Sequence, residues 1–177
     1  MNEFNNVLMS ATKNISKEYF STKIMANGCV KEVYRERVYC YELYHQIRRQ
    51  WESGGVVEFY GEFDKSGSSF YAGTGLQRVK PDFLIHLPGN AENNHIAMEV
   101  KSSAVRRPDL QKDIEKLIKL TDDHGFKFGV YLIYGKNAAT KGEIANECID
   151  DRSNIKIFIH DEVGAKAFAL GAPQATV

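Results

Sequence analysis

Three charged side chains stand at the ends of two short apolar segments, where buried strands would not be expected to carry charge. Asp82 begins the segment DFLIHL (82–87), and Glu99 and Lys101 interrupt the segment HIAMEVK (95–101). Two carboxylates and an amine that meet at one edge of a sheet would form a site with the chemistry of metal-dependent hydrolysis. The question is whether the fold brings them together.

The segment 95–101 predicts a strand with one apolar face, because strand side chains alternate between faces. One face would carry Ile96, Met98 and Val100, and the other would carry His95, Ala97, Glu99 and Lys101. Glu99 and Lys101 would then lie roughly 6.5–7 Å apart along the strand, from a rise of ~3.3 Å per residue. A link containing Pro-Gly-Asn (88–90) favours a hairpin between the two segments, which would bring Asp82 beside Glu99 and Lys101.

Two carboxylates at close range repel each other, and a divalent cation relieves that repulsion by binding both. Oxygen ligands suit Mg²⁺, or Mn²⁺, which completes its shell with water and substrate phosphate. The ammonium of Lys101 would orient an attacking water or offset charge in the transition state. This set of residues fits the hydrolysis of a phosphodiester. The alternative is a solvated salt bridge between Glu99 and Lys101 on an exposed sheet face.

The surrounding segments predict the elements that would position these residues. Spacings of three and four among Cys40, Leu43, Tyr44, Ile47 and Trp51 predict a helix over 32–51. Strands are expected at 56–63, 82–87, 95–100, 128–134 and 155–160, and helices after Pro108, around 141–149 and at the C-terminus. Residues 2–25 predict one or two helices. The order of elements predicts an α/β protein with a mixed central sheet flanked by helices.

The motif KPD (80–82), a spacer and EVKSS (99–103) resemble the PD-(D/E)XK nuclease superfamily. The segment RERVYCYEL (35–43) is similar to the opening helix of the archaeal-type Holliday-junction resolvases within it. The resemblance covers about residues 32–135 and implies a restriction-endonuclease-like αβββαβ core. It also implies that Asp82 and Glu99 are metal ligands and that Lys101 is the catalytic lysine.

The helix offers two candidates for a third carboxylate, and helical geometry favours Glu36. With Cys40 at zero, Glu36 falls at about −40°, on the predicted buried stripe, and Glu42 at about 200°, on the opposite face. A buried carboxylate needs a partner, and a metal site would supply one. Glu36 also matches the Glu-Arg pair of the resembled family. The alternative is that Glu36 is an early-turn glutamate favoured by the helix dipole.

Several further residues are candidates for accessory roles. Gln111 lies in the first turn of the helix after Pro108, where branches of the resembled family place a glutamine, although a plain exposed residue is equally compatible. A set of basic residues near the motif could hold a phosphate backbone, or could be solvated surface: Arg78, Lys80, Arg106 and Arg107. We interpret His86 as structural and His95 as a residue of the hairpin tip.

Composition sets the remaining expectations. The 177 residues suit a nuclease-like domain over 32–177 with an N-terminal helical extension over 1–31. Basic and acidic residues number 23 each, so any nucleic-acid contact must rest on local patches. No stretch is apolar enough to cross a membrane and no signal peptide is evident, and three cysteines without a CxxC motif indicate reduced thiols in the cytoplasm. Zinc and serine-hydrolase motifs are missing from the sequence.

Two functions follow from these expectations. The first is a Mg²⁺-dependent nuclease that acts on DNA, in which Asp82, Glu99 and Glu36 bind the metal and Lys101 assists the attacking water. The second is a module on the same fold that binds nucleic acid or protein without cutting it. DNA is the expected partner, and a homodimer is left open.

Overall fold

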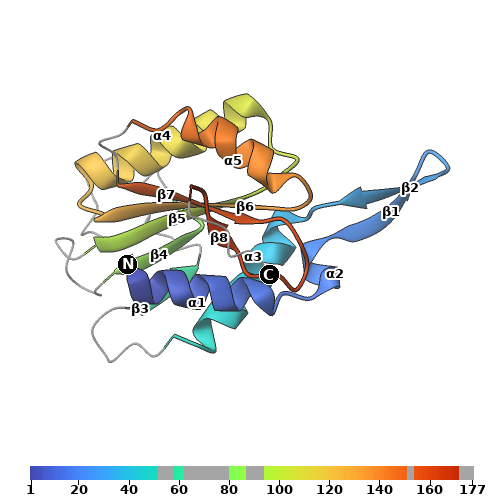
Figure 1. Ribbon diagram of the computed structural model, residues 1–177, viewed down its shortest axis with the longest axis horizontal. Coiled ribbons are helices and arrows are strands. Elements are labelled where there is room, and N and C mark those ends of the chain that lie inside the picture. Colours follow the sequence, from blue (N-terminus) through green and yellow to red (C-terminus); the bar gives the residue numbers. More distant parts are fainter. Residues whose placement is uncertain (52–57, 62–79, 87–93, 151–153, 172–177) are drawn as a thin grey trace.

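A computed structural model describes residues 1–51, 58–61, 80–86, 94–150 and 154–171. The described residues form five helices and eight strands (Figure 1). In chain order these are α1 (Asn2–Lys13), α2 (Lys17–Phe20), β1 (Thr22–Ala26), β2 (Cys29–Val33), α3 (Glu36–Arg48), β3 (Glu58–Gly61), β4 (Phe83–His86), β5 (Asn94–Ser102), α4 (Arg107–Asp123), β6 (Phe128–Tyr134), α5 (Ala138–Asn146), β7 (Ile155–His160) and β8 (Phe168–Ala169).

The main sheet is mixed, and its strands run in the order β3-β4-β5-β6-β7-β8. The pairs β3–β4, β4–β5 and β7–β8 are antiparallel, whereas β5–β6 and β6–β7 are parallel. The helices α4 and α5 cover one face of this sheet, and α1 and α3 cover the other (Figure 1). The prediction of an α/β protein with a mixed sheet flanked by helices is therefore confirmed.

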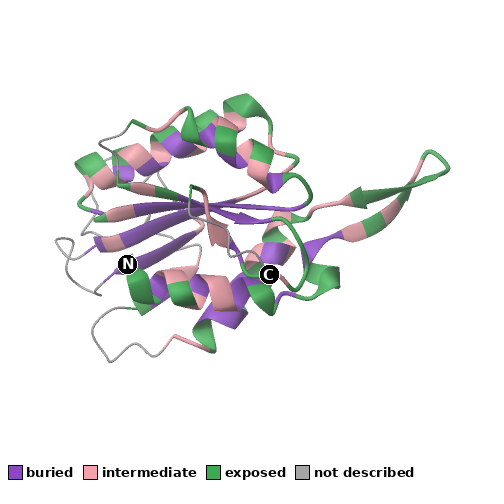
Figure 2. Cartoon of the chain, viewed as in Figure 1, coloured by how far each residue is buried: buried purple, intermediate pink, exposed green. Residues whose placement is uncertain are grey.

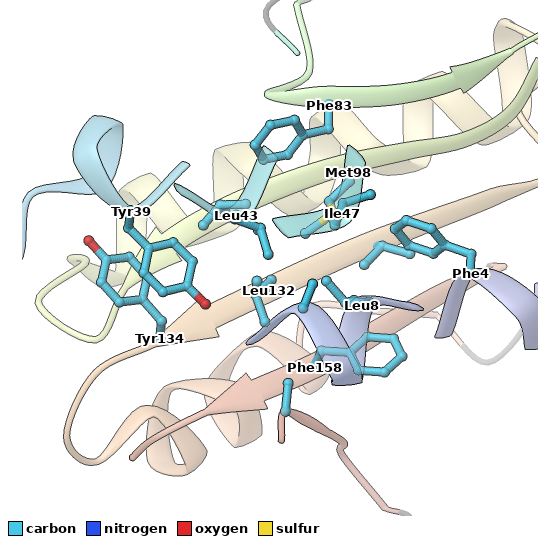
Figure 3. Close-up of a cluster of buried hydrophobic side chains, with 14 of the residues drawn as sticks. Phe4, Leu8, Tyr39, Leu43, Ile47, Phe83, Met98, Leu132, Tyr134 and Phe158 are labelled. Carbon is cyan, nitrogen blue, oxygen red and sulfur yellow. The ribbon is translucent and has the colours of Figure 1, made fainter. Parts of the chain in front are cut away.

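The core on the α1–α3 side is large and aromatic. Its buried side chains include Phe4, Leu8, Leu43, Ile47, Phe83, Met98, Leu132 and Phe158 (Figure 3). At one end of this core the rings of Tyr39 and Tyr134 stack with centroids 3.7 Å apart, and the Tyr39 hydroxyl lies 2.7 Å from His160 Nδ1. Because α1 supplies part of this core, the N-terminal helix packs on the same sheet as the rest of the chain.

The central strands show the alternation that the sequence predicts. Ile96, Met98 and Val100 face the α1–α3 core, and Ala97 faces the helices α4 and α5. Strands β6 and β7 have the predicted bounds, and they are buried along most of their length (Figure 2). Strand β4 ends at His86 within the described residues, and the Pro-Gly-Asn link lies outside them.

Helix α3 is shorter than predicted, and its buried stripe is rotated. The helix begins at Glu36, because residues 29–33 belong to strand β2. Its buried residues are Tyr39, Leu43, Gln46 and Ile47, whereas Cys40, Tyr44 and Trp51 are only half-buried. On the helical wheel the centre of the stripe therefore lies at about −70°, rather than near Cys40. Glu36 still falls within it.

The segment after α2 differs from the prediction of one or two helices. Strands β1 and β2 form an antiparallel hairpin that projects from the body of the protein and is largely exposed (Figures 1 and 2). Asn27 and Gly28 both have positive φ angles, 51° and 74°, as a two-residue hairpin turn requires. The Asn-Gly dipeptide was the signal for this hairpin, and the sequence interpretation overlooked it.

The chain after β7 also differs from the prediction of a terminal helix. Within the described residues it turns back and adds the short strand β8, antiparallel to β7.

Among the described residues, no helix combines the length and apolarity that a membrane crossing needs.

Candidate functional site

The pairing of β4 with β5 stops where the candidate site begins. The pairing ends at Phe83, the first residue of β4, which lies opposite Met98. Asp82 immediately precedes Phe83 in the chain. Beyond this point β5 continues to Ser102, so its carboxyl end is not covered by β4. The carboxylate of Asp82 replaces the missing ladder partner, because its Oδ2 accepts a hydrogen bond of 2.8 Å from the Val100 N–H. Asp82 is therefore fixed beside the segment that carries Glu99 and Lys101.

Glu99 is the most deeply buried charged residue of the site. Only 1% of it is exposed, and the Lys116 ammonium lies 2.6 Å from its Oε1. Burial, and next the negative charge of Asp82, raise the pKa of Glu99 to about 8, although Lys116 opposes this shift. At neutral pH this carboxyl group is therefore poised to bind either a proton or a cation.

Lys101 is held by two carboxylates. Its Nζ lies 2.8 Å from Glu36 Oε1 and 3.8 Å from Asp113 Oδ2. Burial opposes charge on this amine, but the hydrogen bond to Glu36 and the charge of Asp113 outweigh it and raise the pKa of Lys101. Lys101 is therefore a cation and a hydrogen-bond donor in this site, and it has no lone pair to offer a metal or to accept a proton.

Glu36 reaches the site from the first turn of α3, while Glu42 does not. Burial raises the pKa of Glu36, although the hydrogen bond from Lys101 opposes this shift. Glu42 instead accepts a 2.6 Å hydrogen bond from Gln46 of the same helix. Of the two carboxylates that the sequence offered, the structure brings Glu36 to Lys101.

Helix α4 contributes two residues that the sequence interpretation missed. Asp113 lies near Lys101 and 3.4 Å from the Tyr131 hydroxyl, and Lys116 contacts Glu99. With Leu110 at zero, Asp113 falls at about −60° on the helical wheel, between Leu120 and Leu117, which are both buried. A carboxylate inside an apolar stripe was the signal that could have identified Asp113.

Gln111, the predicted accessory residue of α4, lies away from this cluster. It is exposed, and its side-chain amide donates to Glu115 Oε1 at 3.0 Å. On the wheel it is about 100° from Leu110, outside the stripe that faces the sheet. The structure therefore gives Gln111 a surface contact instead of a contact with the charged cluster.

Three of the predicted nucleic-acid contacts lie at the surface, Arg106 and Arg107 at the start of α4 and Lys80 beside Lys116 of the same helix, whereas Arg78 is outside the described residues. Arg106 forms an ion pair of 2.7 Å with Asp109, and Arg107 one of 3.0 Å with Glu147. The side chains of Arg106 and Arg107 are 80% and 62% exposed, so both remain accessible to a ligand. Lys80 is exposed as well, and its backbone carbonyl accepts from Lys116 at 3.2 Å.

The cluster as a whole contains more acidic than basic side chains. It consists of four carboxylates and two ammonium groups: Glu36, Asp82, Glu99, Asp113, Lys101 and Lys116. If all were ionised, two negative charges would remain. A divalent cation would balance them.

The carboxylates of the cluster are oxygen donors of the kind that Mg²⁺ prefers. Within the described part of the chain, no three Asp, Glu, His or Cys side chains converge as a ready-made metal site. Mg²⁺ needs only one or two carboxylates, however, because water and phosphate complete its shell. Asp82 and Glu99 fit that requirement, and the buried Glu99 has a raised pKa that a cation would lower. The metal roles predicted for Asp82, Glu99 and Glu36 all stay predictions. One oxygen of each carboxylate is already engaged, by the Val100 N–H, by Lys116 and by Lys101 respectively.

Comparisons with protein-family models, with curated proteins and with solved structures find no match to this chain.

Proposed function

We propose that the protein is a Mg²⁺-dependent nuclease that hydrolyses phosphodiester bonds in DNA. The observation that carries the proposal is the convergence of Asp82, Glu99 and Lys101 at the end of β5 that extends beyond its pairing with β4, in a cluster with more acidic than basic side chains. Strongly perturbed pKa values gather at functional sites, and that of Glu99 is raised to about 8. We also propose that the sheet and its helices form a restriction-endonuclease-like core, and the order α3-β3-β4-β5-α4-β6 supports this.

Five of the six cluster residues have a role in this proposal. Asp82 and Glu99 would hold the ion, which when bound polarises the phosphate and lowers the pKa of a water molecule. Lys101 stays outside the metal shell and donates a hydrogen bond to the attacking water or to a phosphate oxygen. Glu36 and Asp113 keep Lys101 charged and aimed at the site. Arg106 and Arg107, at the start of α4, are placed to contact the phosphate backbone.

A second function is favoured by one specific contact. The Lys116 ammonium already lies on Glu99 Oε1 at 2.6 Å, so an internal cation offsets part of the charge that a metal would neutralise. If Lys116 stays paired with Glu99, it takes the position of the metal ion. The protein would then bind DNA or protein on the same surface without cutting it. The cytoplasmic location and the homodimer stay predictions.

The test is divalent-ion-dependent cleavage of plasmid, linear, single-stranded and branched DNA by the wild type and by two variants. Lys101→Ala should abolish cleavage, while Glu115→Gln, an exposed position on α4, should cleave like the wild type. Calorimetric titration with Mg²⁺ or Mn²⁺ should show binding by the wild type and weaker binding by Asp82→Asn. Failure of the wild type to bind either ion, even with DNA present, would favour the non-cutting module instead.

A further inference from the structure

A cleft of about 460 Å³ lies against the charged cluster, between α3 and the start of β4. Its walls differ in character. Glu36 and Asp82 form the side next to the cluster, and Tyr41, Tyr44 and Phe83 form an aromatic side, with Arg37 also lining it. We call it the aromatic cleft. Its volume lies in the range of pockets that bind small molecules.

The aromatic side is pre-formed. The Tyr44 ring stacks on Phe83 with planes 7° apart and on Phe59 with centroids 5.5 Å apart. A Cβ at Gly61 would come within 3.3 Å of the Tyr44 ring and 3.4 Å of Phe83, so the glycine leaves this surface open. The floor of the cleft therefore consists of rings whose positions are set by packing.

Tyr41 has a different environment. It is 63% exposed, although it lies in the middle of α3 beside the cleft. An exposed tyrosine adds little to the core, but it offers a flat apolar face at the entrance to the aromatic cleft.

A second cleft, of about 540 Å³, lies on the other side of Glu36. It is lined by three cationic side chains, those of Lys101, Arg106 and Lys112, and by three carboxylates, those of Glu36, Asp109 and Asp113. We call it the polar cleft. Because Glu36 lines both clefts, the aromatic cleft and the polar cleft meet at the carboxylate cluster.

This arrangement matches the parts of one nucleotide. A base has a flat π face that stacks on aromatic side chains, whereas its phosphate seeks cations. A base that remains stacked and paired in a duplex cannot enter a cleft between a helix and a strand. The aromatic cleft would admit a base only from a strand end, a flap, a junction or a single strand.

We propose that the aromatic cleft binds an unpaired nucleobase next to the scissile phosphate, so that the substrate class is DNA with a single-stranded segment. The inference rests on the proposed nuclease function and specifies its substrate. The phosphate lies toward Lys101 and Arg106 in the polar cleft, and the base stacks on Tyr41 and Tyr44.

The test measures equilibrium binding by fluorescence anisotropy, with Ca²⁺ in place of Mg²⁺. The ligands are a short single-stranded oligonucleotide, the blunt duplex of the same sequence, and an abasic strand of equal length and charge. The wild type should prefer the single strand to the abasic strand by about five- to 150-fold, the range that stacking of a base supplies. The duplex should bind no more tightly than the abasic strand.

Tyr41→Ala should lose most of this preference, as expected for one stacking side chain, while its affinity for the abasic strand stays unchanged. Tyr41→Phe keeps the ring and should behave like the wild type, which separates stacking from any effect on folding. Tyr19→Ala, an exposed tyrosine outside the cleft, is the matched control and should keep the full preference.

The outcomes separate this inference from the nuclease function. If DNA is cleaved but Tyr41→Ala keeps the full preference for bases, the aromatic cleft does not bind a base and this inference is wrong. The same conclusion follows if the wild type binds the duplex best. If Tyr41→Ala loses the preference but the wild type cleaves nothing, base binding stands and the nuclease function fails.

Discussion

Replacing Glu99 with glutamine should stabilise the protein at alkaline pH and leave its stability at acidic pH nearly unchanged. Glutamine has almost the shape of a protonated glutamate but cannot ionise. Glu99 is 1% exposed, and its pKa is raised to about 8 by burial and by Asp82. Between the ordinary value of 4.5 and about 8, the folded protein keeps a proton that the unfolded chain has released. The free energy of unfolding of the wild type therefore falls as pH rises through this window.

The size of the stability difference between Glu99→Gln and the wild type follows from the pKa shift of Glu99. Each unit of pKa corresponds to about 1.4 kcal/mol, so the full shift of Glu99 sets an upper limit of about 5 kcal/mol. Water that enters the site once the carboxylate ionises would reduce this cost. We expect Glu99→Gln to exceed the wild type by about 2–4 kcal/mol at about pH 9 and to match it within about 1 kcal/mol at about pH 5.

Urea unfolding, followed by the fluorescence of Trp51, measures this difference. Trp51 is the single tryptophan, and it packs against Phe4 of α1 with ring centroids 6.1 Å apart, so it reports on the core. Mg²⁺ adds a second readout, because a ligand of the folded state stabilises it by mass action. At about pH 8 the ion should raise the stability of the wild type and leave that of Glu99→Gln unchanged.

Glu115→Gln is the matched control, since it makes the same substitution at an exposed position of α4. Its difference from the wild type should be independent of pH. A difference between Glu99→Gln and the wild type that stays constant from about pH 5 to about pH 9 would refute the reasoning, because Glu99 would then titrate like an exposed glutamate. His160, whose pKa burial lowers to about 4, gives the opposite slope at acidic pH, and comparison at each pH cancels it.

Three further substitutions have expected outcomes. Lys101→Ala should reduce cleavage on the order of a hundredfold or more and change the calorimetric affinity for Mg²⁺ little, because it removes no ligand. Lys116→Ala removes the cation 2.6 Å from Glu99, so it should bind Mg²⁺ more tightly and be less stable than the wild type without the ion, by calorimetry and urea unfolding. Tyr39→Phe deletes the 2.7 Å contact with buried His160 and should lower the free energy of unfolding by about 1–3 kcal/mol.

The strands of the main sheet were the most predictable part of the fold. Strands β6 and β7 are buried central strands, which read as nearly continuous apolar segments, and their predicted bounds agree with the structure. The alternation along β5 correctly placed Met98 and Ala97 on opposite faces of the sheet. The β1–β2 hairpin was missed because its strands bury little, so their apolar pattern is weak, and only the Asn-Gly turn marks it.

The charged cluster was predictable only in part. Strand alternation placed Glu99 and Lys101 on one face, and helical geometry separated Glu36 from Glu42. The partners on α4 depend on how that helix packs across the sheet, which sequence spacing does not determine. Asp113 and Lys116 are therefore tertiary features, and Gln111, chosen from a resemblance, faces another direction.

The excess negative charge of the cluster can be balanced in two ways, and this links proton binding to ion binding. Protonation of Glu99 and of one other carboxylate whose pKa is raised, Glu36 or Asp113, would neutralise the site without a metal. A divalent cation would neutralise it with both carboxylates ionised. The two states exclude each other, since a protonated carboxyl is a poor ligand, so binding of the proposed ion would release protons and would strengthen as pH rises.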